Sequence, residues 1–527
     1  MNVDTLENNL KEFLSNPEST NHLTKARDLA EEILNKKKDS SYANYVLALD
    51  DIEFCNYDDA IEKLKKILEN DNSFEEAYLQ LSMIYEHEKM KEKRFLMLEK
   101  GYQHCPECYM IAFDYACMLM NDYADVYKAK DILSDCVHKL PQMPNNWAQL
   151  GIAYIATQEP EMAKECFITC LHLDKENVLA HLGLGVYFFE TSQFKKAKEF
   201  YKKTLEKEEN FFANFNLSLL ELLQGNYKKG FELYEKHRDK EKFLEKYGGD
   251  GYPELTKKNL KEKNLKIVVH REQGYGDDFM ASRFLKSFLD KNYEVSFAAH
   301  KSTINFFKSC PELDSVNISD KFDDVDETSF DYRIFMMSLP YLFWENSKKI
   351  INPLIVDVER LKSFNVNFYK FLSKRIDKSK LNIGVSWSGN PQHKRHLNRS
   401  IQIDIFSEIF KNNDCKFFVL QKGVSNEEHK FLQKFSNVEV LDNKLEDFSQ
   451  TALALGLMDR VITVDTSLVH LAGTLDQKTL LLLPKVPDWR WGLKDSKTPW
   501  YKSVKMVRQS KFNDWSHINN EVKKFLS

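Results

Sequence analysis

The chain lacks any long apolar run, which argues against a membrane-spanning protein. No run approaches the roughly 20 residues that a transmembrane helix needs. The longest one extends from Thr479 to Pro484 and is better interpreted as a buried strand. No apolar segment follows Met1-Asn2-Val3-Asp4, so no signal peptide is expected. We therefore expect a soluble, cytoplasmic protein without a membrane span.

An excess of one charge is also lacking. The 75 Lys and Arg residues nearly balance the 80 Asp and Glu residues, and the net charge is −5. This balance provides no global attraction to nucleic acid, so no nucleic-acid partner is expected. With 527 residues the chain exceeds a single core, and a hydrophobic content of 43% suits two or three globular domains.

Several catalytic and metal signatures are missing. Gly274-Tyr275-Gly276 lacks the third glycine of a dinucleotide-binding loop, and no Gly-x-Ser-x-Gly elbow of a hydrolase occurs. Asp323-Asp324-Val325-Asp326 is better interpreted as a solvated turn than as a metal-binding Asp-x-Asp motif. Among nine scattered cysteines, Cys105-Pro106-Glu107-Cys108 has the CxxC spacing of zinc ligands, and no second CxxC follows. We therefore expect neither a metal nor a cofactor.

The N-terminal half contains a 34-residue repeat. Two sets of residues recur at this spacing: Trp147, His181 and Phe215, and Ala163, Ala197 and Phe231. Within each unit a small residue allows two helices to approach, and large residues fill the groove between neighbouring hairpins. The period resembles the tetratricopeptide repeat and predicts a superhelix over residues 1–245. Its concave surface is expected to bind a peptide or protein, or else to form a homodimer.

After a Gly-rich linker over residues 246–265, strand–helix alternation replaces the helical repeat. We expect two doubly wound, Rossmann-type units, at 266–380 and 381–527, so that the fold class is α plus α/β. The expected strands are 267–269, 294–299, 333–336, 383–387, 416–420, 438–441, 461–464 and 479–483. The cleft between two such units is a common substrate site.

A basic loop follows the expected strand 383–387. Gly389-Asn390-Pro391 forms a turn at the strand end, and a basic run that includes Lys394 and Arg399 comes next. Several of these charges are close enough in sequence to converge on one phosphate. A solvated basic loop is the alternative. We count four residues as candidates for binding a phosphorylated, nucleotide-linked small molecule, which is called the donor below. They are Asn390, Lys394, Arg399 and Gln421, the last of which follows the strand 416–420.

A second polar strand end lies at Asp465-Thr466-Ser467, where a helix containing His470 begins. The free N–H groups and the positive dipole end of such a helix suit a phosphate. The alternative is a capped helix with a core-facing histidine. Four nearby aromatic residues are candidates for stacking on a base or sugar, although packing is their commoner role: Trp489, Trp491, Trp500 and Tyr501.

The start of the first α/β unit carries two carboxylates. Gly276 permits a tight turn, and Asp277 then lies at a helix start facing the expected cleft. A carboxylate in this place is suited to act as a general base on an acceptor hydroxyl. The alternative is that Asp277 or Asp278 only caps the helix.

Taken together, the motifs resemble bacterial proteins in which tetratricopeptide repeats are fused to a glycosyltransferase-B domain related to family 9 heptosyltransferases. The resemblance extends from about residue 140 to the end. The matching runs are Glu272-Gln273-Gly274-x-Gly276-Asp277, Gly384-Val385-x-Trp387-x-Gly389-Asn390-Pro391-x-His393-Lys394, Asn398-Arg399-Ser400-Ile401, Val464-Asp465-Thr466-Ser467-x-Val469-His470-Leu471-Ala472-Gly473 and Pro487-Asp488-Trp489-Arg490-Trp491.

The resemblance implies a metal-independent transferase that moves a sugar from a nucleotide-sugar donor to a protein. It implies that Asp277 is the base and that Lys394 lies near the donor phosphate. It further implies that Asp465, Thr466, Ser467 and His470 bind the donor. Some relatives modify flagellin with a nonulosonic acid, a sialic-like sugar. The chain departs from the family in having a second carboxylate, Asp278, so either member of the pair remains a candidate base.

Two other functions stay open at this point, a non-catalytic repeat scaffold that senses a sugar nucleotide and a transferase for the lipopolysaccharide core. The sequence also leads us to expect separable halves. Residues 1–240 are expected to fold alone and to bind the acceptor, and residues 260–527 to keep affinity for the donor.

Overall fold

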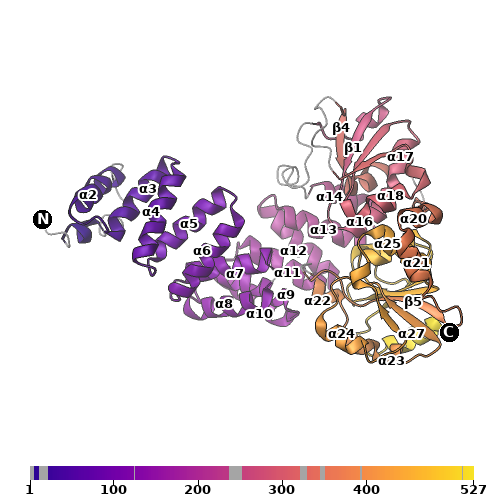
Figure 1. Ribbon diagram of the computed structural model, residues 1–527. Helices are drawn as coiled ribbons and strands as arrows, with labels where there is room; N and C mark the ends of the chain where they lie inside the picture. The colour runs from indigo at the N-terminus through magenta and orange to yellow at the C-terminus, as the bar shows by residue number, and fades with distance from the viewer. Residues whose placement is uncertain are drawn as a thin grey trace. The chain divides into compact units, whose positions relative to one another are not determined.

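The computed structural model describes residues 5–10, 22–123, 125–236, 252–320, 329–344, 351–391, 395–512 and 514–527. The chain divides into two compact units, Met1–Asn177 and Val178–Ser527 (Figure 1). The sequence-based borders at residues 245, 265 and 380 remain predictions. Within the described residues, no helix combines the length and the apolar character that crossing a membrane requires.

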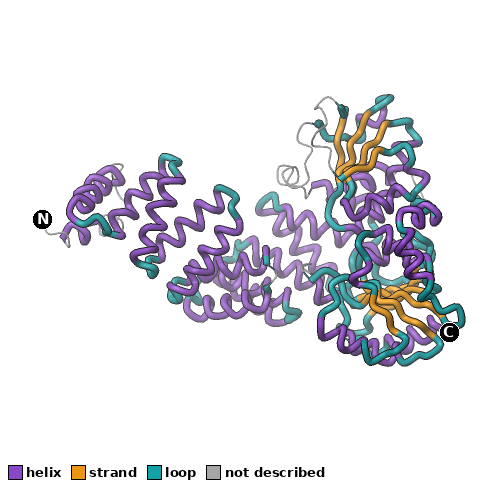
Figure 2. Tube along the Cα trace, viewed as in Figure 1, coloured by secondary structure: helices purple, strands orange, loops and turns teal. Residues whose placement is uncertain are grey.

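The first unit consists of helical hairpins. Its helices are α2 (His22–Lys36), α3 (Ser41–Glu53), α4 (Tyr57–Asn70), α5 (Glu75–His87), α6 (Lys91–His104), α7 (Tyr109–Asp122), α8 (Val126–Lys139), α9 (Pro144–Ala156) and α10 (Pro160–Leu173). Consecutive helices from α3 to α10 pair as hairpins of nearly equal length (Figure 2). The expected helical repeat is therefore present.

Close approach of the two helices in a hairpin depends on a small residue in the first helix. A Cβ on Gly151 of α9 would lie 2.5 Å from Cε1 of Phe167 on α10, which is closer than real Cβ contacts. The turns inside three of the hairpins, α3–α4, α5–α6 and α9–α10, also share one conformation. Cys55, Lys89 and Gln158 all have φ near +60°, the left-handed conformation that commonly ends a helix. The 34-residue spacing of the sequence is thus the spacing of one repeated hairpin.

The second unit starts with four further repeat helices, α11 (Val178–Glu190), α12 (Phe194–Lys207), α13 (Phe211–Leu223) and α14 (Tyr227–Lys236). The α/β part follows. Its strands are β1 (Lys266–His270), β2 (Glu294–Ala298), β3 (Asn317–Ser319), β4 (Tyr332–Phe335), β5 (Leu381–Ser386), β6 (Cys415–Val419), β7 (Val438–Val440), β8 (Arg460–Val464), β9 (Thr479–Leu483) and β10 (Val504–Arg508). Its helices are α16 (Tyr275–Ala281), α17 (Lys286–Leu289), α18 (Ile304–Lys308), α19 (Leu339–Phe343), α20 (Val358–Phe364), α21 (Val366–Ser373), α22 (His396–Arg399), α23 (Ser407–Phe410), α24 (Asn426–Leu432), α25 (Phe448–Gly456), α26 (Ser467–Thr474) and α27 (Ile518–Leu526).

Both sheets are parallel and have the strand order of a doubly wound fold. The first sheet has the order β3-β2-β1-β4, and the second has the order β10-β9-β8-β5-β6-β7. Counted from its own first strand, the second sheet therefore has the order 3-2-1-4-5-6 of Rossmann folds, and the first sheet has the first four strands of that order. The two expected doubly wound units are present.

Strand β9 shows how the second sheet is covered on both faces. Its side chains alternate: Leu480 and Leu482 join one buried cluster with α23 and α27, whereas Leu481 and Leu483 join another with α25 and α26. A strand buried on both faces has an unbroken apolar sequence, which is why the leucine run belongs to a strand.

Several elements were not expected from the sequence. Among them are the short edge strand β3 of the first sheet, the edge strand β10 of the second sheet, the helices α19 and α22 and the C-terminal helix α27. Residues 275–289 form a series of short pieces, α16, a 3-10 turn η2 (Ser282–Leu285) and α17, in place of one continuous helix. A fully buried Arg283 in this turn donates to the carbonyl oxygens of Met280 and Trp500, so the interruption joins the two α/β parts.

The last repeat hairpin shares its core with the α/β part. Phe231 of α14 packs edge-on against Trp489, with ring centroids 5.8 Å apart, and Tyr227 packs in the same way against Trp500. The hydroxyl of Tyr234 donates to the buried Glu272 at 3.2 Å. The expectation that the chain separates near residues 240–260 is therefore revised, because a cut there divides one hydrophobic core.

Candidate functional site

The candidate site lies at the centre of the second sheet, at the carboxyl ends of β5 and β8. These neighbouring strands begin the two halves of the Rossmann order, and their loops diverge to opposite faces. Open α/β sheets bind ligands at this switch point, since diverging loops leave a crevice between them. The sequence-predicted residues of the basic loop and of the α26 start all follow these two strands.

Gln421 holds the loop after β5 in place. Its Oε1 accepts hydrogen bonds from the backbone N–H groups of Trp387 at 3.1 Å and Ser388 at 2.8 Å. The side chain is 7% exposed. Because its oxygen already satisfies two loop donors, Gln421 shapes the site from behind.

Arg399, at the end of α22, lies against the loop after β5. A Cβ built on Gly389 would lie 3.0 Å from Nη2 of Arg399 and 3.2 Å from Cγ2 of Thr466. The guanidinium group and Thr466 at the start of α26 thus both lie against Gly389 of the loop after β5. Its buried Nε has no hydrogen-bond partner among the described residues, and burial lowers the pKa of Arg399. A desolvated guanidinium group with an unsatisfied N–H near a helix start is suited to an anion.

The rest of the basic loop is committed to other contacts. Arg395 donates from Nη2 to Glu190 of α11 at 3.3 Å and to the carbonyl oxygen of Val486 at 3.0 Å. Asn398 also donates to Glu190, at 3.3 Å. Asn390 is exposed in the turn after the strand. Lys394, together with residues 392 and 393, lies outside the described residues.

The start of α26 has the conformation that the sequence predicts. Thr466 is the N-cap, and its hydroxyl accepts from the N–H of Leu468 at 3.3 Å. Asp465 and Ser467 flank it and are partly exposed. Burial, together with the nearby Asp488, raises the pKa of Asp465 to about 6, while the charge of Arg399 opposes this shift.

His470 does not line the crevice as a ligand-binding residue. It is 4% exposed, its Nδ1 lies 3.0 Å from the Tyr501 hydroxyl, and its ring packs on Trp491 with centroids 5.1 Å apart. Burial holds the pKa of His470 well below its ordinary value, and the charge of Arg490 acts in the same direction. A neutral, packed ring agrees with a core-facing histidine.

Asp277, at the start of α16, pairs with Arg490. Its Oδ2 accepts from the N–H of Gly274 at 3.1 Å, so it does cap the helix. Its Oδ1 accepts from Nη2 of Arg490. The other terminal nitrogen of Arg490, Nη1, donates to Asp488 at 2.8 Å. Burial raises the pKa of Asp277, and the positive charge of Arg490 opposes that effect. The side chain of Asp277 retains 14% exposure.

The neighbouring carboxylate, Asp278, has a different environment. Its side chain is fully buried, and Oδ2 lies 2.7 Å from Nδ1 of His300. Burial raises the pKa of Asp278 to about 6, although the hydrogen bond to His300 opposes the shift. The accessible carboxylate of the pair is thus Asp277.

The aromatic residues near the site pack in the core. All four are at most 3% exposed: Trp489, Trp491, Trp500 and Tyr501. The interpretation that they stack on a base or sugar is therefore wrong for this arrangement. They instead form the wall that holds His470, Arg283 and the last repeat hairpin.

Sequence reasoning gave no role to Arg490, Asp488, His300 or Glu190. A signal existed for the first two, since Pro487-Asp488-Trp489-Arg490-Trp491 belongs to the motifs noted above. No local pattern marks His300 or Glu190, because their partners lie 22 and 205 residues away.

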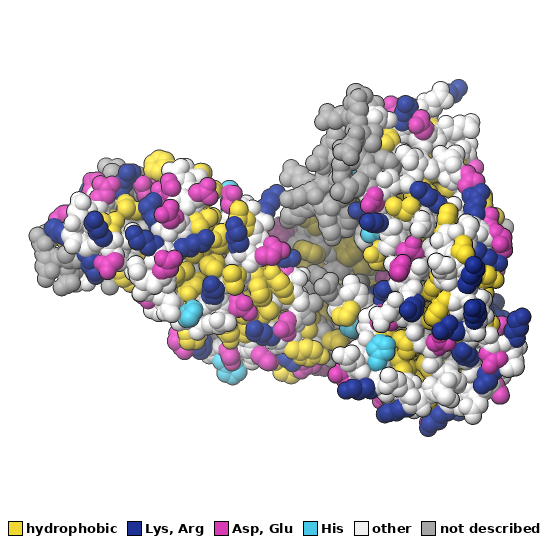
Figure 3. Space-filling model, in the orientation of Figure 1, with side chains coloured by type: hydrophobic (Ala, Val, Ile, Leu, Met, Phe, Trp, Pro, Cys, Tyr) yellow, Lys and Arg dark blue, Asp and Glu magenta, His cyan; other side chains and the backbone are white. Residues whose placement is uncertain are grey.

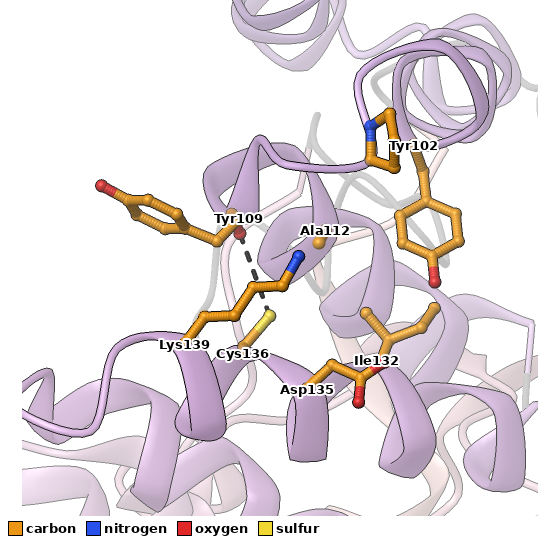
Figure 4. A pocket seen from close by; sticks show the side chains of 8 residues that line it. Tyr102, Tyr109, Ala112, Ile132, Asp135, Cys136 and Lys139 are labelled. Atoms are coloured by element: carbon orange, nitrogen blue, oxygen red, sulfur yellow. Dashed lines mark hydrogen bonds between the residues drawn. The ribbon is translucent and has the colours of Figure 1, made fainter.

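The first unit has surface features of its own. Figure 3 shows apolar side chains gathered on the visible face of the helical repeats. The exposed apolar residues of the first unit include Met83, Met110 and Met162. A small pocket between α6, α7 and α8 has a volume of about 40 Å³, room for a water molecule or two (Figure 4). It is lined by Tyr102, Pro106, Tyr109, Ala112, Ile132, Asp135, Cys136 and Lys139.

The cysteine pair with zinc-ligand spacing is used in packing. Cys105 and Cys108 are buried, and the thiol of Cys105 donates to the carbonyl oxygen of Ser73 at 3.4 Å. Burial raises the pKa of Cys105 to about 11, which favours the thiol over the metal-binding thiolate. Across the described ranges, no three His, Cys, Asp or Glu residues are grouped as metal ligands.

No protein-family model and no curated protein matches the chain. Among solved structures it is similar to YrrB, a TPR protein with an unusual peptide-binding site, with 18% identity over 35% of this chain and 95% of that one, and a TM-score of 0.32. It is similar to MamA of Desulfovibrio magneticus RS-1, with 18% identity over 32% and 94% and a TM-score of 0.29. It is also similar to PilF of Pseudomonas aeruginosa, with 17% identity over 40% and 94% and a TM-score of 0.31.

Proposed function

We propose that the chain is a metal-independent glycosyltransferase of the glycosyltransferase-B type, which transfers a sugar from a nucleotide-sugar donor to a protein. One observation is the main support. At the switch point of a Rossmann-order sheet, Arg399 lies beside the N-cap of α26 with its buried Nε unpaired. Both the guanidinium group and the helix dipole favour a phosphate at this point.

The first sheet, through helix α16, supplies the acceptor side of the proposed reaction. Asp277 accepts the proton of the acceptor hydroxyl, and the oxygen forms a bond to the anomeric carbon. The bond from that carbon to the phosphate oxygen breaks, and the nucleotide leaves with its electron pair. Arg399 and the start of α26 offset the charge of the leaving group, which is the role that a metal ion has in other transferases. Among the two neighbouring carboxylates, accessibility favours Asp277 as the base.

The acceptor part of the proposal is supported by the helical repeats of the first unit. Their exposed apolar side chains suit a peptide or protein, and the repeats raise the local concentration of a bound acceptor to the order of millimolar. Flagellin as acceptor and a nonulosonic acid as sugar follow from the family resemblance and are the first candidates to try.

Titration calorimetry against a panel of sugar nucleotides, followed by intact-mass analysis of candidate acceptors, tests the proposal. Donor binding with a mass gain of one sugar residue supports it. Donor binding without any mass gain on protein or lipopolysaccharide acceptors favours the sensing scaffold instead, and a gain only on lipopolysaccharide favours the lipid-core transferase. Loss of turnover in EDTA contradicts the metal-independent mechanism.

A further inference from the structure

Arg490 occupies a position between two carboxylates that come from distant parts of the chain. It belongs to the 3-10 turn η9 (Trp489–Trp491), where it donates to Asp488 at 2.8 Å and to Asp277, which is 213 residues away in the sequence. Its guanidinium carbon lies 4.3 Å from the ring centroid of Trp489. The side chain is 8% exposed, and its Nε has no hydrogen-bond partner among the described residues.

The contact with Arg490 restrains the proposed base. One carboxylate oxygen of Asp277 accepts from the N–H of Gly274, and the other accepts from Arg490. A base that removes a hydroxyl proton needs an oxygen within hydrogen-bond reach of that hydroxyl. In the present arrangement both carboxylate oxygens of Asp277 already accept hydrogen bonds. Asp277 is therefore not free to accept the hydroxyl proton as long as its hydrogen bond to Arg490 persists.

The pair belongs to the same charge cluster as the proposed phosphate site. The charges of Asp465, Asp488 and Asp277 all act on Arg399, and those of Asp277, Asp488 and Asp465 all act on Arg490. Two arginines therefore face three carboxylates. A phosphate that enters this cluster adds negative charge and competes directly with Asp277 for Arg490, because guanidinium groups bind phosphate and carboxylate in the same two-pronged way.

We propose that Arg490 is a phosphate-binding residue that switches partners: it holds Asp277 while the site is empty and turns to the donor phosphate when the donor binds. The inference rests on the proposed function and adds a residue to it. The base is then released only after the donor is in place. When an acceptor binds while the donor site is empty, Asp277 is still held by Arg490. The acceptor hydroxyl therefore loses its proton only when a donor sugar is present to form a bond to its oxygen.

The switch makes an unusual prediction about anion affinity. In the unmodified protein, a phosphate must displace Asp277 from Arg490 before it binds there. Asp277→Asn removes the competing charge but keeps an oxygen for the Gly274 N–H. We expect this variant to bind inorganic pyrophosphate and nucleoside mono- and diphosphates at least about tenfold more tightly than the unmodified chain, given the strength of close charge pairs. Its transferase activity is expected to be lost.

A second substitution distinguishes partner switching from simple charge repulsion. Arg490→Gln is expected to weaken binding of the same anions about tenfold. In the double variant the Asp277→Asn substitution is expected to have almost no effect, because its benefit passes through Arg490. A gain that persists undiminished in the double variant shows repulsion by Asp277 alone and overturns the proposal. Unchanged or weaker anion binding by Asp277→Asn overturns it as well.

Asp278→Asn is the matched control, since the neighbouring carboxylate pairs with His300 rather than with Arg490. We expect it to leave anion affinity unchanged, and equal tightening in both variants contradicts the switch. Asp277→Ser, which keeps a capping oxygen without the charge, repeats the test should the asparagine variant be unstable. If no anion binds to the unmodified chain or to either Asp277 variant, the proposed function fails together with this inference.

Discussion

Gly276 and His470 lie in direct contact: a Cβ on Gly276 would be 2.7 Å from Cδ2 of His470. Gly276 lies in the first turn of α16, which follows strand β1 of the first sheet. His470 lies in α26, which follows strand β8 of the second sheet. The His470 ring has no room to retreat, because Tyr501 and Trp491 hold it from the other sides. Glycine at position 276 thus allows the helix that carries Asp277, the proposed base, to approach α26.

Gly276→Ala is therefore expected to be destabilising. A methyl group inserted against a fixed ring costs about 1–3 kcal/mol of unfolding free energy. The variant is also expected to lose transferase activity, because displacement of α16 moves Asp277. Denaturant unfolding monitored by circular dichroism measures the first effect. Gly274→Ala is the control, since its Cβ would meet only Oδ2 of Asp277 at 3.6 Å. Equal stability of the two variants contradicts the proposed contact.

Glu190→Ala is expected to weaken donor binding although it lies in a repeat helix. Glu190 anchors Arg395 and Asn398 at the start of the short segment that carries Arg399. Without this anchor, Arg399 is less well placed, and we expect a several-fold higher dissociation constant for the nucleotide. Because the pair is partly exposed, the loss of stability should not exceed about 1 kcal/mol. Glu199→Ala, an exposed residue of α12, is the control. Identical nucleotide affinity in both variants shows that α11 plays no part in the site.

The third prediction concerns where the chain can be truncated without loss of folding and nucleotide binding. A fragment of residues 178–527 is expected to unfold cooperatively and to bind nucleotide as the full chain does. A fragment of residues 252–527 is expected to aggregate, because it exposes Trp344, Trp489 and Trp500 where Tyr227 and Phe231 had packed. Size-exclusion chromatography and calorimetry measure both properties. A soluble, cooperatively unfolding 252–527 fragment contradicts the shared core.

Loss of the first unit is expected to weaken binding of the protein acceptor and to leave binding of the donor unchanged. In the 178–527 fragment, transfer to the natural protein acceptor should fall sharply, whereas transfer to a short peptide should change little. Kinetic measurements with both acceptors test this division. If the fragment modifies the full acceptor at the rate of the intact chain, the first unit does not hold the acceptor.

Asp278→Asn is expected to change how stability depends on pH. The pKa of Asp278 is about 6 in the folded chain against an ordinary value of 3.8, so the folded state resists ionisation of this carboxyl. The contribution of Asp278 to stability is fully present below pH 3.8 and is lost as the pH rises through 6. The stability of the variant relative to the unmodified chain should therefore rise between about pH 4 and 7, by about 3 kcal/mol at most, and stay level above that range. Urea unfolding at several pH values measures the difference, and a difference that does not vary with pH contradicts it.

The sequence predicted the elements with strong periodicity and missed those with weak local signals. The 34-residue period gives the hairpins, and apolar runs give eight of the ten strands. Strand β3 has three residues and borders only β2, so its sequence bears little mark of burial. Strand β10 borders β9 at the edge of its sheet, and Lys505 and Arg508 interrupt its apolar residues.

The sequence predicted which residues of the candidate site follow the strand ends. It did not predict the ion pairs and hydrogen bonds that these residues form. Asp465, Thr466 and Arg399 follow the strand ends that converge at the switch point, which a sequence pattern reveals. The pair of Asp277 and Arg490 depends instead on how two sheets pack, and no local propensity reports a contact over 213 residues. The same holds for Gln421, whose side chain was expected to face a ligand and instead satisfies the loop behind it.

The division of the chain within the run of repeats has an evolutionary consequence. Hairpins before Val178 belong to a unit of their own, so whole repeats can be gained or lost there without disturbing the core of the α/β part. The hairpin of α13 and α14 has no such freedom, because its inner face is built into that core. Related chains should therefore vary in the number of their early repeats and keep the last hairpin unchanged in length, so that change is concentrated in the first unit and the shared core is preserved.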